Sequence, residues 1–98
     1  MSTVITSDRQ RTDLLIDCLE RESITATTVI AGLTAYVRHP NGGLIQAGQR
    51  FWSKNTDKFV GWAVTYEGRD SINRGGEFRT KKLSEVVAEI QRLLAVAA

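Results

Sequence analysis

Aromatic and basic side chains are interleaved in the middle of this 98-residue chain. Flat rings can stack on unpaired bases while guanidinium and ammonium groups neutralise phosphates, so this combination is typical of a nucleic-acid-binding surface. The candidate stacking residues are Tyr36, Trp52 and Phe59. The candidate phosphate ligands beside them are Arg38, Arg50, Lys54 and Lys58. This pattern predicts a non-catalytic module that binds single-stranded or duplex nucleic acid.

A second basic group precedes the last predicted helix and consists of Arg74, Arg79, Lys81 and Lys82. The two lysines fall in the first turn of that helix, where the helix dipole favours negative charge instead. Free N–H groups of a first turn also attract phosphate, so the lysines could bind the same ligand. The alternative is that both are simply solvated, with Lys81 near Glu85 one turn later. Sequence alone leaves both interpretations open.

The aromatic residues have alternative roles that the sequence does not separate. Trp52 could cap the core at a strand end, and Phe59 could join a small cluster under a loop. Tyr, Trp and Arg are also the preferred anchors of protein interfaces, so the chain could be a small adaptor or inhibitor of phage or plasmid type. Two such faces could also pair in a symmetric homodimer.

The charge is unevenly distributed although the net charge is only +2. Residues 1–22 hold three basic and five acidic side chains, and residues 83–98 hold one basic and two acidic. Residues 23–82 hold nine basic against four acidic side chains. Such a separation creates a local field that can steer an anionic partner.

The residues that most enzymes require are scarce. Cys18 and His39 are the only cysteine and the only histidine, and they are distant in sequence. Internal disulfides are therefore impossible, and Cys18 falls on the apolar stripe of a helix, where it serves as a small core residue. The motifs of hydrolases, zinc proteases and nucleotide-binding proteins do not occur. We expect no enzymatic activity, no metal and no cofactor.

No segment reaches the roughly 18 apolar residues that a membrane-spanning helix needs. The first residues also lack the basic stretch and apolar run of a signal peptide. We expect a cytoplasmic protein without a membrane partner.

Hydrophobic periodicity predicts one α+β domain over residues 1–98, with residues 1–6 as a flexible N-terminal segment. A helix is expected at 7–22, with Leu14, Leu15, Cys18 and Leu19 as its apolar stripe. Three antiparallel strands are expected at 27–38, bent at Gly32, at 44–52 and at 58–67. A glycine-rich loop at 68–76, a short edge strand near Phe78 and a last helix with Thr80 as N-cap complete the order.

Alternation along the strands assigns side chains to the two faces of the predicted sheet. The bulkier face is expected to meet both helices, which would then lie on the same side of the sheet. The opposite face would carry Tyr36, Arg38, Gln46, Arg50, Trp52, Phe59 and Thr65.

The order of elements resembles that of double-stranded-RNA-binding domains, over about residues 12–94. The matching residues are Lys81 and Lys82, with Gly75 or Gly76 before them. The resemblance implies that these lysines contact phosphates across a major groove. The family's Gly-Pro-x-His loop is missing, since residues 38–41 read Arg-His-Pro-Asn there.

Replacing Trp52 tests whether its ring is available for a ligand. If the ring is exposed, Trp52→Ala leaves the free energy of unfolding in urea nearly unchanged. A loss of about 3 kcal/mol or more would instead place the ring in the core.

Overall fold

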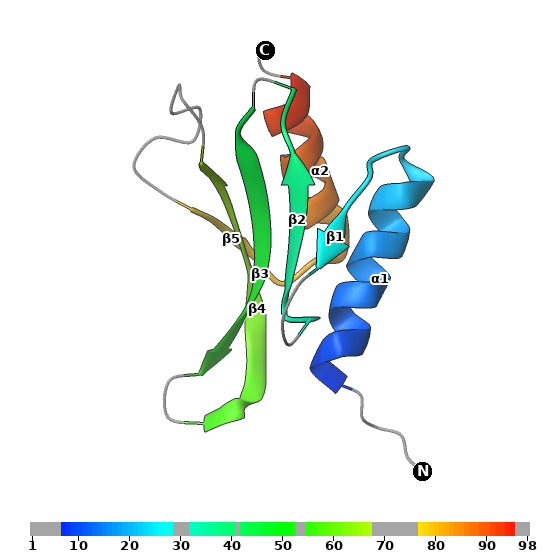
Figure 1. Cartoon of the computed structure of the whole chain (residues 1–98). Coiled ribbons are helices and arrows are strands. Elements are labelled where there is room, and N and C mark those ends of the chain that lie inside the picture. Colours follow the sequence, from blue (N-terminus) through cyan, green and yellow to red (C-terminus); the bar gives the residue numbers. More distant parts are fainter. Residues whose placement is uncertain (1–6, 29–31, 41, 53–54, 68–76, 96–98) are drawn as a thin grey trace.

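The computed structural model describes residues 7–28, 32–40, 42–52, 55–67 and 77–95. It contains two helices and a five-stranded antiparallel sheet with the strand order β1-β2-β3-β4-β5 (Figure 1). The elements are α1 (Ser7–Arg21), β1 (Thr27–Thr28), β2 (Thr34–Arg38), β3 (Leu44–Trp52), β4 (Asn55–Glu67), β5 (Phe78–Thr80) and α2 (Leu83–Ala95). The α+β class is confirmed, with five strands instead of three or four. Among the described residues, no helix is long and apolar enough to cross a membrane.

One hydrophobic core joins both helices to one face of the sheet. Helix α1 packs against β2, whereas α2 crosses β3, β4 and β5. The helices contribute the fully buried residues Leu15, Leu19, Val86, Ile90 and Leu93. The strands contribute Ala35, Val37, Ile45, Ala47, Trp62, Val64 and Tyr66, which alternate with more exposed neighbours. Both helices therefore cover the same face, as the alternation predicted.

The predicted single strand at 27–38 is wrong, because this stretch forms a hairpin. Thr27 pairs with Tyr36 and Thr28 with Ala35, so β1 folds back on β2. Gly32 lies before β2 with a φ of 66°, in the left-handed region that glycine adopts without strain. The residues 29–31 lie outside the described part of the chain. Gly32, which the sequence predicted to bend a single strand, thus lies in the connection between the two strands of a hairpin.

A β-bulge interrupts the long β3–β4 hairpin. Arg50 pairs with Gly61, but the next residue, Phe51, pairs with Phe59. Val60 is therefore an extra residue in β4, and Gly61 has a φ of 142°. Because side chains alternate with a period of two, one extra residue reverses the facing of β4 at Phe59, up to the second register shift between Phe51 and Trp52.

The reversal turns Phe59 toward the helices, so its predicted place on the opposite face is wrong. Its ring packs edge-on against Trp62 and Phe51, with centroid distances of 5.9 and 6.2 Å. The Arg11 guanidinium of α1 lies 4.3 Å from the Phe59 centroid, in cation–π geometry. Phe59 therefore fastens the start of α1 to the hairpin.

The buried stripe of α1 differs from the predicted one. Leu14 is 55% exposed, whereas Thr12 is fully buried beside Leu15 and Leu19. Gln49 of β3 donates a hydrogen bond of 2.8 Å to the Thr12 hydroxyl, which makes burial of this polar group tolerable. The sequence pattern favoured the more apolar residue because it could not show this partner.

Helix α2 begins two residues later than a Thr80 N-cap would require. The Lys82 carbonyl accepts the first helical hydrogen bond, from the Val86 N–H at 3.1 Å. Thr80 is held in β5 by pairing with Trp62, and its hydroxyl accepts from the Lys82 N–H at 3.2 Å. Lys81 and Lys82 therefore precede the helix and do not occupy its first turn, which corrects the prediction.

His39 has a structural role at the predicted turn. Its side chain is only 3% exposed, and its ring packs edge-on against Tyr66 at 5.3 Å. Nε2 lies 2.9 Å from the Leu93 carbonyl, which can only accept, so Nε2 donates. His39 thus joins the β2–β3 turn to the end of α2.

The position of Phe59 can be checked by comparing two aromatic substitutions. We expect Phe59→Ala to lower the free energy of unfolding by about 2–4 kcal/mol, since it removes a ring packed on the core. Tyr36→Ala, on the opposite face, is expected to cost about 1 kcal/mol or less. Urea unfolding measures both, and equal losses would contradict the bulged register.

Candidate binding surface

The face of the sheet that the helices leave uncovered is here called the outer face. Its central row runs across three strands, from Tyr36 through Gln46 to Thr65. All three side chains are half-buried by their neighbours in the sheet. The outer face thus carries these predicted residues on the predicted side.

The predicted ligand residues form two separate groups on this face. Arg38 pairs with Leu44, whereas Arg50 lies six residues further along β3. At 3.4 Å per residue, this places the Cα atoms of Arg38 and Arg50 about 20 Å apart. Tyr36 and Arg38 form the edge group. The basic group consists of Arg50 and Arg79, whose pairing places them on the outer face, and of three exposed lysines: Lys58 on β4, and Lys81 and Lys82 between β5 and α2.

Gly61 brings two members of the basic group together. Arg50 pairs with Gly61 across the hairpin. A Cβ atom on Gly61 would lie 3.5 Å from Cγ of Lys81 and 3.0 Å from the carbonyl oxygen of Thr80. Because Gly61 has no side chain, the segment that leads from β5 to α2 can lie against it. Lys81 and Arg50 therefore both lie next to Gly61.

The residues next to Arg50 and Lys81 on the outer face have small side chains that leave both of them accessible. Gly48 pairs with Ala63, which pairs in turn with Arg79. Arg79 forms an ion pair with Glu77 at 2.5 Å, so part of its charge is already neutralised. Within the basic group, Arg50, Lys81 and Lys82 are therefore better suited than Arg79 to bind an external anion.

Charge separates by layer in the folded protein. The two helices contain four basic and six acidic residues. The strands together with residues 77–82 contain six basic and three acidic residues. The six are Arg38, Arg50, Lys58, Arg79, Lys81 and Lys82. The uncovered side of the sheet thus lies on the basic layer, and the acidic helices lie behind it.

Three predicted site residues are not placed by the structure. The backbone of Trp52 ends β3 opposite Asn55. The side chain of Trp52, and all of Lys54 and Arg74, lie outside the described residues. Their proposed contacts stay predictions.

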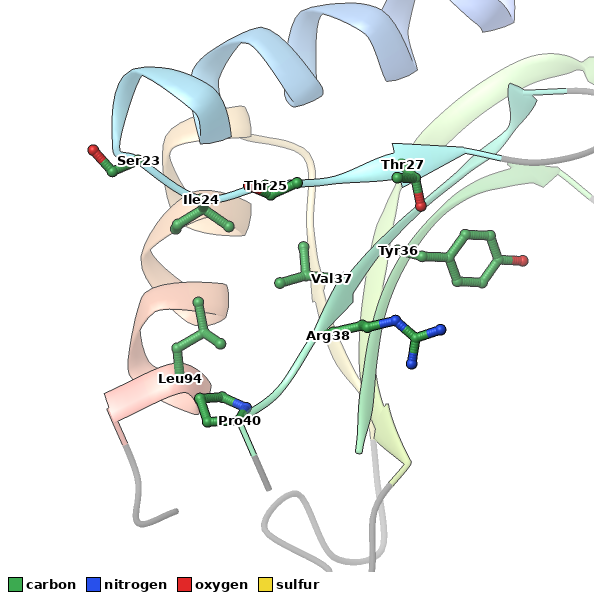
Figure 2. Close-up of a pocket in the computed structure, with 9 residues that line it drawn as sticks. All are labelled: Ser23, Ile24, Thr25, Thr27, Tyr36, Val37, Arg38, Pro40 and Leu94. Carbon is green, nitrogen blue, oxygen red and sulfur yellow. The ribbon is translucent and has the colours of Figure 1, made fainter. Parts of the chain in front are cut away.

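The structure also shows a pocket that sequence analysis missed. It lies between the end of α1, β2 and the end of α2, with a volume of about 420 Å³ (Figure 2). Its lining includes Ile24, Val37, Pro40 and Leu94, with Tyr36 and Arg38 at one side. Ser23, two residues after the end of α1, has a φ of 63°, and the Ile24 N–H donates a hydrogen bond of 2.9 Å to the Leu19 carbonyl. An apolar residue just after a helix end often packs back in this way, which is the only sequence signal for the pocket.

The side chains known for nucleophilic chemistry do not meet. Cys18 is half-buried in a groove between α1 and α2 that includes Ser84 and Gln91. His39 is held by Leu93 near the other end of the core. Within the described ranges, no three His, Cys, Asp or Glu side chains gather as metal ligands would.

Comparison of the chain with protein-family models, curated proteins and solved structures finds no match. The resemblance to double-stranded-RNA-binding domains was drawn on three strands between the helices, whereas the structure has five. The matching lysines, Lys81 and Lys82, lie before α2 and not within it, and the matching glycines, Gly75 and Gly76, lie outside the described residues.

Two glycine substitutions test how Gly61 shapes the basic group. We expect Gly61→Ala to lower the free energy of unfolding by about 1–3 kcal/mol, because φ is positive and the new Cβ meets backbone. Gly48→Ala is the matched control, since its Cβ would contact only the Thr34 side chain, at 3.3 Å. It should change stability by about 0.5 kcal/mol or less. Similar losses in urea unfolding would show that the conformation of Gly61 is not required.

Proposed function

We propose that the basic group of the outer face binds the phosphate backbone of a nucleic acid without catalysing a reaction. The supporting observation is the separation of charge between the layers, with the basic side chains on the sheet. A field of one sign over an open surface raises the rate at which an anionic polymer is encountered. Neutralising phosphates then releases counterions, which is the main source of sequence-independent affinity.

The geometry favours phosphate contacts over a platform of stacked bases. Phe59 packs against Trp62 inside the protein and is lost to the outer face. Tyr36 lies in the edge group, about 14 Å along β3 from the row of Arg50. Base stacking would therefore depend on Trp52, while Arg50 and Lys81 lie beside the same glycine.

Salt dependence tests the proposal most directly. We expect a labelled single strand of roughly 20 nucleotides to bind at low salt, with log affinity falling linearly as log salt rises. Fluorescence anisotropy between about 50 and 200 mM salt gives the slope. Arg50→Gln and Lys81→Gln should each reduce the slope by about 0.7, or by about 0.9 with duplex DNA, for one lost phosphate contact.

The control is Arg21→Gln, which removes the same charge from an exposed position at the end of α1. This variant should keep the slope of the parent protein. Equal effects of Arg21→Gln and Arg50→Gln on the slope would mean that binding depends only on the net charge of the protein and not on the basic group. Failure of both polymers to bind at low salt would reject the proposal.

A further inference from the structure

Within the described part of the chain, no strand pairs with β2 at Arg38 on the side away from β3, so the edge of β2 is open there. The Gln49 N–H donates to the Leu33 carbonyl at 3.1 Å, and the His39 N–H donates to the Gly43 carbonyl at 2.9 Å. In an antiparallel ladder, bonded pairs alternate, so the odd-numbered residues of this stretch bond β3. The N–H and carbonyl of Arg38 therefore point away from β3. Strand β1 pairs only with residues 35 and 36 and does not reach them.

Hollows lie on both sides of this open edge. The pocket on the helix side is apolar, with Ile24, Val37 and Leu94 around it (Figure 2). A second hollow of about 260 Å³ lies by Leu44 and shares Tyr36 and Arg38 with the first. Figure 2 shows Tyr36 and Arg38 directed to one side of β2 and Val37 to the other. Successive side chains of an extended chain also point to opposite sides, so one chain along this edge would fill both hollows.

The edge is also suited to a carboxylate. Among the described residues, no acidic side chain forms an ion pair with the Arg38 guanidinium. The space between β1 and β2 closes where Thr27 pairs with Tyr36. A chain that lies along Arg38 antiparallel to β2 points its C-terminal end at this closed position. A chain whose last residue lies at Arg38 therefore fits without turning away, and its free carboxylate comes near the guanidinium.

We propose that this edge binds the extended C-terminal segment of another protein. Arg38 pairs with it through its backbone, an apolar side chain enters the hollow at Ile24 and Leu94, and the terminal carboxylate lies beside the Arg38 guanidinium. Addition of a strand to an exposed edge gives affinity through main-chain bonds and specificity through alternate pockets. A phosphodiester backbone has no N–H for the Arg38 carbonyl and no apolar group for the pocket. The inference is independent of the proposed nucleic-acid contacts, because Arg50 and Lys81 take no part in it.

The test uses a pool of acetylated peptides, Ac-Gly-Ser-Ser-X-X, with apolar residues at X and a free C-terminal carboxylate. The same pool with an amidated C-terminus is the matched probe. Titration of the carboxylate pool into ¹⁵N-labelled protein should shift the amide signals of Ile24, Arg38 and Leu94. The affinity of the amidated pool should be lower by a factor of about ten or more.

Two variants separate the parts of the site. Arg38→Gln should lower the affinity for the carboxylate pool about tenfold, so that the carboxylate and amidated pools bind equally well. Thr25 is an exposed residue of the pocket wall, so the larger side chain of Thr25→Trp should fill the pocket and block peptide binding. This variant leaves the charge of Arg38 unchanged. Arg50→Gln removes the same charge elsewhere and should bind as the parent protein does. Circular dichroism checks that each variant is folded.

Several outcomes would overturn the inference. These are no shift with millimolar peptide, equal binding of the carboxylate and amidated pools, or shifts confined to residues around Arg50. A nucleic acid that shifts the Arg38 signals when the peptides do not would assign the edge to phosphate binding instead. Failure of Arg50→Gln to affect nucleic-acid binding would reject the proposed function and leave the peptide site intact.

Discussion

The positive φ of Gly61 is the constraint on which the arrangement of both faces depends. With one extra residue before it, β4 reverses its alternation and places Phe59 under Arg11 and against Trp62. On its other side, the absent side chain leaves room for Thr80 and Lys81. The same residue thus completes the aromatic core and brings a lysine beside Arg50. A side chain at this position would disturb both.

Chain order and charge combine to polarise the molecule. The acidic ends of the sequence become the helices and the basic middle becomes the sheet, so separation along the chain becomes separation between two layers. Because both helices cover one face, their carboxylates lie mostly behind the sheet. The field on the uncovered face follows from topology as much as from composition.

The ends of the helices shape the edge of the sheet. Ser23 turns the chain sharply after α1 and places Ile24 against the core. His39 ties the β2–β3 turn to the last turn of α2 through the Leu93 carbonyl. These two contacts hold Leu94 and Ile24 in the wall of one pocket, beside the part of β2 that β1 is too short to reach. The edge group and the basic group are therefore distinct surfaces on one sheet.

The sequence by itself determined the α+β class, the strand at Leu44–Trp52 and the outward facing of Tyr36, Gln46 and Thr65. Periodicity carries this information because each such residue obeys the local rule for its element. Only tertiary structure decided where Phe59 faces, why Thr12 is buried in place of Leu14, and that Tyr36 and Arg50 are far apart. A bulge, a hydrogen bond from a distant strand and a register are relations between segments, and no window of sequence contains both partners.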